Sequence, residues 1–156
     1  MSDETLETEA GGLSISVIAQ YVRDLSFENP GEVTAPTQPQ IDLGVDVQAA
    51  AKSSEDSVFE VALKLSAKAK ADDRTMFICE LDYAGLFKLV NAEREDLEPM
   101  LLVECPRLLF PFARRIMADI TREGGFPPLL VDPVDFAHLY LAQKQKAAGN
   151  PPSSNA

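Results

Sequence analysis

The sequence predicts an α+β fold, in which a four-stranded antiparallel, meander-like sheet is followed by a long kinked helix and a short C-terminal helix. Two observations lead to this prediction. Apolar and polar residues alternate through most of residues 13–89, which is the period of strands, whereas apolar residues recur every three or four positions over residues 101–120, which is the period of a helix. Short joins between the alternating segments favour antiparallel neighbours.

The chain of 156 residues is expected to form one domain. We expect this domain to span residues 13–147, between a disordered acidic tail at residues 1–12 and a disordered tail at residues 148–156. The first residues resemble no signal peptide, and no apolar run approaches the roughly 20 residues of a membrane span. A cytoplasmic protein without direct membrane insertion is therefore predicted.

The first strand is expected to begin at Leu13, with the odd-numbered positions through Tyr21 on one face. Residues 28–39 follow as a connection, because they hold prolines that could not donate to a strand ladder. Three further segments alternate and are predicted to be strands: Ile41–Ala49, Phe59–Lys70 and Thr75–Leu89. The Asp-Asp pair at residues 72–73 predicts a tight turn between the last two.

The predicted long helix carries an apolar stripe at spacings of three and four residues. Its members are Leu101, Cys105, Leu108, Leu109, Phe112, Ile116 and Ile120. Pro106 and Pro111 each remove a backbone hydrogen bond, so we expect a kink or interruption near one of them. A glycine pair at residues 124–125 can end this helix in the left-handed conformation. Asp135 can cap a last helix that continues to about Ala147.

The net charge of −11 is concentrated in the N-terminal part of the chain. Residues 1–60 hold 12 acidic and 2 basic side chains, whereas residues 61–156 hold 13 acidic and 12 basic ones. An acidic region of this kind repels nucleic acid and anionic membranes and attracts a basic partner. Acidic side chains can also be present only to keep a protein soluble. The charge therefore argues against nucleic acid as a ligand, but it does not identify a partner.

The residues offer little for catalysis. Cys79 and Cys105 have apolar neighbours and no metal-ligand spacing, so both are expected to be reduced core residues. The sequence contains no glycine-rich phosphate loop, and no cofactor or metal is predicted. The single histidine, His138, follows Asp135 by three residues, a spacing that lets side chains meet on a helix. One alternative therefore stays open: a small hotdog-like hydrolase or ligand-binding domain that uses these two residues as an acid–base pair.

Five motifs occur in order along the chain. They are Arg23–Glu28 (RDLSFE), Phe77–Glu80 (FICE), Cys105–Arg114 (CPRLLFPFAR), Gly125–Leu129 (GFPPL) and Pro133–Phe136 (PVDF). Together, from about Ile15 to Ala142, they resemble the bacterial protein-export chaperone family SecB. The resemblance implies a homotetramer, a dimer of dimers in which long helices meet. The interface helix would contribute Leu101, Cys105, Leu108, Leu109, Phe112 and Ile116.

The resemblance also implies a function. A cytosolic chaperone of this family holds unfolded preproteins in an export-competent state and delivers them to the SecA translocation motor, without acting as an enzyme. SecA would contact Asp24, Glu28, Ile78 and Glu80, and the client groove would include Phe27, Phe77, Phe136 and Tyr140. Thr37 stands where members of the family often carry a tryptophan, which alters this aromatic subsite. A SecB-like chaperone devoted to one partner, such as an antitoxin, is a second alternative.

Overall fold

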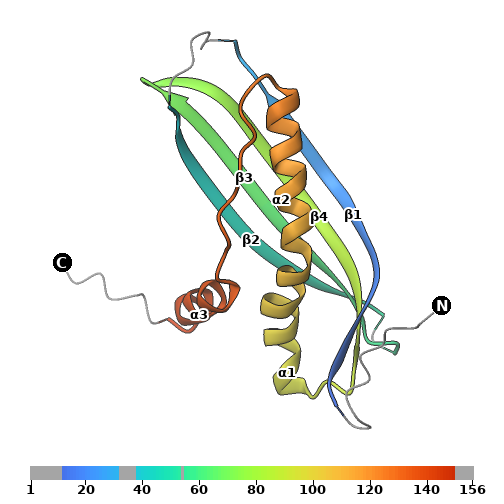
Figure 1. The fold of residues 1–156 in the computed structure, drawn as a ribbon. Coiled ribbons are helices and arrows are strands. Elements are labelled where there is room, and N and C mark those ends of the chain that lie inside the picture. The colour runs from blue at the N-terminus through green and yellow to red at the C-terminus, as the bar shows by residue number, and fades with distance from the viewer. Residues whose placement is uncertain (1–11, 32–37, 54, 150–156) are drawn as a thin grey trace.

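The computed structural model describes residues 12–31, 38–53 and 55–149. It confirms the predicted fold class, because a four-stranded antiparallel sheet forms one layer and the helices lie over one of its faces (Figure 1). The two predicted tails fall almost wholly outside the described residues, and so does Thr37. We call the face of the sheet that carries the helices the inner face, and the opposite face the outer face.

The four strands are β1 Ser14–Glu28, β2 Gln40–Ser53, β3 Val58–Ala71 and β4 Arg74–Val90. Their order across the sheet is β1-β4-β3-β2, so that β2 to β4 form a meander while β1 lies at the far edge beside β4. The connection that follows β1 is long enough to carry the chain to the opposite edge. By contrast, β3 and β4 are joined by Asp72 and Asp73, whose φ angles of 49° and 64° suit a primed hairpin turn and confirm the predicted turn.

Two bulges in β1 decide which of its side chains face the helices. The pairing of β1 with β4 shifts around Ile18 and again around Arg23. Each extra residue reverses the alternation of the side chains that follow it. The prediction that the odd-numbered positions through Tyr21 share one face is therefore wrong. After the second bulge, Phe27 pairs with the buried Cys79 and faces inward, and the even-numbered residues of β1 face outward.

The long helix is interrupted once, as predicted. Its parts are α1 Arg94–Pro99, a π-helical turn η1 Met100–Glu104 and α2 Cys105–Glu123. The Cys105 amide donates to the Met100 carbonyl, five residues earlier, which is the bond of a π turn. This turn directly precedes Pro106, whose ring would collide with the carbonyl four residues earlier in an uninterrupted α-helix. The interruption therefore lies beside Pro106, whereas Pro111 is accommodated inside α2.

The core fills the space between the sheet and the inner side of α2. Leu109, Ala113 and Met117 of α2 have no exposed surface. Cys79 and Cys105 are also buried, and neither forms a disulfide. This confirms the prediction that both belong to the core. The Cys79 Sγ lies 3.5 Å from the Met117 Sδ, so that sulfur contacts join β4 to α2.

After α2 the chain returns along the same face of the sheet as a connector, residues 124–135, which leads to the last helix (Figure 1). The return begins at Gly125, whose φ of 93° confirms the predicted left-handed glycine end. Thr121 is fully buried and fixes the returning segment, because its hydroxyl accepts a hydrogen bond from the Leu129 amide at 2.9 Å. The same hydroxyl donates to the Met117 carbonyl at 2.9 Å. A single side chain thus joins the end of α2 to the connector that leads to the last helix.

The last helix, α3, spans Phe136–Ala147. Asp135 caps it as predicted, with its carboxylate accepting from the His138 amide at 3.0 Å. The helix packs beside the π turn, and the Phe136 ring centroid lies 6.0 Å from that of Phe110 in an edge-on contact with α2. The connector and α3 therefore extend the helical layer over the inner face.

Candidate functional site

The outer face of the sheet brings together the four residues predicted to contact SecA. Asp24 pairs with Asp82, Ser26 with Glu80, and Glu28 with Ile78, across β1 and β4. Paired residues of an antiparallel sheet point to the same side. Asp24, Glu28 and Glu80 are exposed, and Ile78 is half-buried. The bulges around Ile18 and Arg23 offset one another, so Asp24 and Glu28 lie on the same face that an unbroken alternation from Ile15 would give them.

A polar cluster on the outer face ties β1 to β3 across β4. The Tyr21 hydroxyl donates to Glu60, and the Arg23 guanidinium binds the other oxygen of Glu60 at 3.1 Å. Arg23 also lies 3.7 Å from Asp82, and Lys52 lies 3.8 Å from Glu60. These contacts hold the bulged part of β1 in place, directly beside Asp24. The cluster was not predicted from the sequence, because its members lie on different strands.

The cluster changes the acidity of two of its members. Burial, reinforced by the hydrogen bond to Glu60, raises the pKa of Tyr21 to about 12. The hydrogen bond from Tyr21 lowers the pKa of the Glu60 carboxyl despite its partial burial, and Lys52 and Arg23 act in the same direction. Glu60 is therefore a carboxylate and Tyr21 a neutral donor at neutral pH, which is the pairing that the geometry requires.

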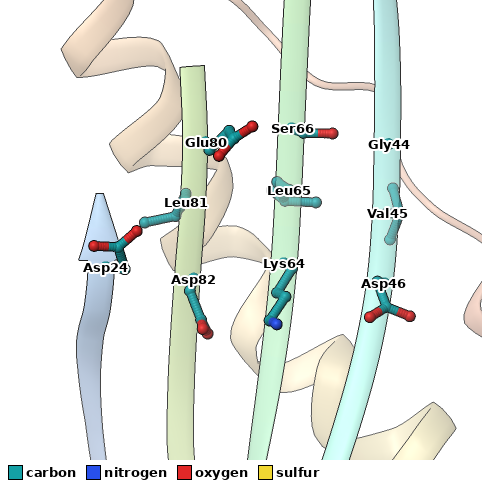
Figure 2. A pocket seen from close by; sticks show the side chains of 10 residues that line it. All are labelled: Asp24, Gly44, Val45, Asp46, Lys64, Leu65, Ser66, Glu80, Leu81 and Asp82. Carbon is teal, nitrogen blue, oxygen red and sulfur yellow. The ribbon is translucent and has the colours of Figure 1, made fainter. Parts of the chain in front are cut away.

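A hollow of about 440 Å³ opens on the outer face beside this cluster and is lined by charged residues of all four strands (Figure 2). Figure 2 shows Glu80, Ser66 and Gly44 in one row across β4, β3 and β2. The neighbouring row holds Asp82, Lys64 and Asp46, and Asp24 lies beside it on β1. Gly44 has no side chain to fill the space, and a Cβ there would press against the Ser66 hydroxyl. The β2 and β3 members were not predicted from the sequence to have a role.

The inner face carries an aromatic cluster near one end of the sheet. The Phe77 ring lies 5.7 Å from that of Phe27 and 5.0 Å from that of Phe126. Phe27 is half-buried, and its ring covers Gly124, where a Cβ would collide with it. Two predicted groove residues therefore meet here. Phe126 joins them, although the sequence alone gave no reason to place it in the groove.

The other two predicted groove residues lie apart from this cluster, on α3. Phe136 has 1% of its surface exposed and Tyr140 has 9%, so both side chains are largely covered within this chain. Lys144 lies over the Tyr140 ring, with its Nζ 5.6 Å from the ring centroid. A client would reach Phe136 only if α3 moved.

A second hollow, of about 650 Å³, lies between β2 and the start of the long helix. Its apolar lining comes from Val47 and Phe59 of the sheet and from Leu97, Leu101 and Leu102 of the helix. Only Leu101 was singled out from the sequence. For Leu97 and Leu102 the sequence did hold a signal. Both share one side of the helix with Leu101, as their spacing just before and within the π turn indicates.

The apolar stripe of the long helix divides between two environments. Leu101, Cys105 and Leu109 face the sheet and are buried within this chain. Leu108 and Phe112 point outward, with 43% and 50% of their surfaces exposed, and Ile116 is half-buried. The Phe112 ring stacks on that of Tyr83, 6.5 Å away, at the side of α2 that faces the edge strand β1. The exposed part of the stripe is thus continuous with the inner side of β1, where Val22 and Leu25 are exposed.

The proposed acid–base pair is not assembled as a catalytic pair. Asp135 and His138 are both exposed, and the Asp135 carboxylate binds the His138 backbone amide. Burial raises the pKa of Cys79 to about 11 and that of Cys105 to about 12, so neither thiol is an activated nucleophile.

In the described part of the chain, no group of His, Cys, Asp and Glu residues could hold a metal ion. No helix among the described residues is long and apolar enough to cross a membrane.

Comparison with known proteins agrees with the geometry. The family model described as preprotein translocase subunit SecB matches residues 8–147. The protein-export protein SecB of Hyphomonas neptunium is 61% identical over 142 residues, which cover 91% of this chain and 86% of that protein. The SecB protein of Maricaulis maris is 57% identical over 144 residues, covering 90% and 83%.

A solved structure shares the fold. It is a SecB-like chaperone of Mycobacterium tuberculosis in complex with a peptide from an antitoxin, and its TM-score is 0.67. The match covers 77% of this chain and 90% of that one at 15% sequence identity. At this identity the likeness concerns the arrangement of strands and helices alone.

Proposed function

The chain belongs to the SecB family, and we propose on this premise that it is a cytosolic chaperone that holds unfolded preproteins and delivers them to SecA. The observation that carries the proposal is the separation of two surfaces by the sheet. The outer face presents exposed carboxylates, and the inner face presents an aromatic cluster and a hollow with apolar lining. The family is one of chaperones rather than of enzymes, so the hydrolase alternative has no support from it.

The inner face would hold the clients. Its aromatic cluster of Phe27, Phe77 and Phe126 and its apolar hollow beside β2 lie toward different ends of the sheet. An extended unfolded chain could occupy both, and each large apolar side chain it buries would contribute roughly 1.5–3 kcal/mol. Several such subsites raise the overall affinity through effective concentration. Folded proteins hide these side chains, which would make the binding selective for unfolded chains.

The outer face would receive SecA. Glu28 lies across from Ile78, Glu80 follows Ile78 on the same face of β4, and Asp24 lies one pair further along, so the patch is acidic with one apolar member. A basic partner segment would be attracted by this patch and fixed in register by it. Because the carboxylates are exposed, this attraction would weaken as salt screens it. SecA would then approach without displacing a client from the opposite face.

The homotetramer would use the parts of the inner face that this chain leaves open. Leu108 and Phe112 of α2 are exposed large apolar side chains, and Val22 and Leu25 continue the same surface on β1. Among the described residues, β1 has a strand partner on one side only, and such an edge favours pairing with another strand. Leu101, Cys105 and Leu109 would support the interface from beneath, as the packed side of the same helix.

A charge-reversal experiment tests this division of labour. In Asp24→Lys combined with Glu28→Lys, SecA binding measured by calorimetry should fall by at least an order of magnitude, because attraction becomes repulsion. Retention of a urea-unfolded preprotein should stay unchanged. The matched control is Glu95→Lys with Glu123→Lys, which changes the net charge equally at exposed helix positions. Equal loss of SecA and client binding in the test variant would contradict the proposal.

A further inference from the structure

The outer face contains a trough that runs across the strands. Its floor is the row of paired residues Ser26, Glu80, Ser66 and Gly44, contributed by β1, β4, β3 and β2 in that order. Three of these four positions carry a hydroxymethyl group or no side chain at all. Two hollows, of about 440 Å³ and 490 Å³, lie on the two sides of this row and share Gly44, Ser66 and Glu80. Figure 2 shows the first of them.

The walls of the trough are two rows of larger, mostly charged residues. One wall is formed by Asp24, Asp82, Lys64 and Asp46, and the other by Glu28, Ile78, Lys68 and Asp42. Carboxylates outnumber ammonium groups in these walls, and Glu80 adds another carboxylate to the floor. Arg23 offsets part of the charge of Asp82, at 3.7 Å, while the second oxygen of that carboxylate has no hydrogen-bond partner among the described residues. The trough as a whole is therefore acidic.

The dimensions of the trough fit an extended peptide. Neighbouring strands lie about 4.8 Å apart, so four strands span about 14 Å, which an extended chain covers with roughly four or five residues. Such a peptide would run nearly at right angles to the strands, and its side chains would meet carboxylates on both walls. The small floor residues leave room for its backbone, whereas a large side chain at Ser66 or Gly44 would fill the space.

We propose that this trough binds an extended basic segment of a partner protein, with lysine or arginine side chains between Glu80 and the carboxylates of both walls, including Asp46 and Asp42 on β2. The inference rests on the proposed function, because SecA is the partner expected at this face. It goes further by extending the docking surface from β1 and β4 across the whole sheet. The β2 edge, far from Asp24 and Glu28, thereby becomes part of the recognition of the partner.

Two variants test the trough without touching the β1 carboxylates. Ser66→Leu blocks the floor at constant charge, and Asp46→Lys reverses one wall on β2. The probe is a fluorescein-labelled peptide of alternating lysine and glycine, followed by fluorescence anisotropy, and its glutamine analogue measures binding without charge. Ser16→Leu is the control for Ser66→Leu, because it makes the same substitution on the outer face, where Ser16 pairs with Lys88, far along β4 from the trough. Glu55→Lys is the control for Asp46→Lys, since it makes the same charge change in the β2–β3 turn.

The expected result is a loss of about tenfold for Ser66→Leu and about threefold for Asp46→Lys, with both controls within about twofold of the unaltered protein. Gly44→Val blocks the same floor from β2 and replaces Ser66→Leu if that variant fails to fold. Equal affinity of the blocked and unaltered proteins for the lysine peptide would overturn the inference.

Purified SecA is measured with the same variants. If SecA binds and responds to charge reversal at Asp24 but not to the blocked floor, the trough is overturned as a docking site while the proposed function stands. If SecA does not bind the unaltered protein at all, the proposed function fails, and the lysine peptide still decides whether the trough exists as a site.

Discussion

Replacing Thr121 with valine should release the connector that leads to α3. Valine has nearly the same shape, so it keeps the packing of this fully buried position and removes only the hydroxyl. The Leu129 amide then loses its acceptor at 2.9 Å in a buried site. An unsatisfied buried donor costs about 1–3 kcal/mol, which corresponds to a roughly 5- to 150-fold change in the opening equilibrium of this segment.

Hydrogen exchange of the Leu129 amide measures this opening directly. The amide should exchange faster in Thr121→Val by that factor, while Thr121→Ser, which keeps the hydroxyl, should retain most of the protection. Client retention should weaken in the valine variant as well, because the connector carries Phe126, which belongs to the aromatic cluster proposed to hold clients. Unchanged exchange at Leu129 in Thr121→Val would refute the reasoning that this hydroxyl holds the connector.

Three further predictions concern other parts of the molecule. Glu60→Gln should lower the free energy of unfolding in urea by about 1–3 kcal/mol at neutral pH. Because the folded protein lowers the pKa of Glu60, this loss of stability should be present above the ordinary pKa of 4.5 and disappear as the pH falls below it; a loss that persists in acid would contradict the role of the Tyr21–Glu60 hydrogen bond. Phe112→Glu should lower the molar mass measured by light scattering, because a charge would enter the subunit interface, whereas Arg115→Glu, also exposed on α2, should leave the mass unchanged. An unchanged mass for Phe112→Glu would exclude this side chain from the interface. Cys105 should react with a thiol reagent only in denaturant, since burial raises its pKa to about 12, and fast reaction of the native protein would show that the site opens.

Local signals in the sequence were sufficient for several features. The Asp72-Asp73 turn, the Asp135 cap and the left-handed Gly125 were all predicted, because each depends on the conformational preference of one or two residues. The interruption of the long helix was also predicted from its prolines. Its π-helical form was not, since either Pro106 or Pro111 could have caused a kink.

Features that depend on pairing between distant strands could not be predicted in this way. The position of β1 beside β4 follows from the pairing of residues far apart in the chain, such as Glu28 with Ile78, and local alternation carries no information about it. The bulge around Arg23 is fixed by contacts with Glu60 and Asp82 on two other strands. This bulge offsets the one around Ile18, so Asp24 lies on the face that unbroken alternation also gives it. A role for that carboxylate was indicated by the resemblance to SecB and not by periodicity. The division of the helical stripe into buried and exposed members likewise required the position of the sheet.

The proposed function requires that this protein bind unfolded chains and ignore folded ones. Size-exclusion chromatography with light scattering tests it most directly, first on the protein alone and then after mixing with a urea-unfolded, slow-folding preprotein. We expect a tetramer that retains the unfolded preprotein and does not retain the same preprotein after refolding. A monomer that captures neither form would contradict both the assembly and the chaperone function.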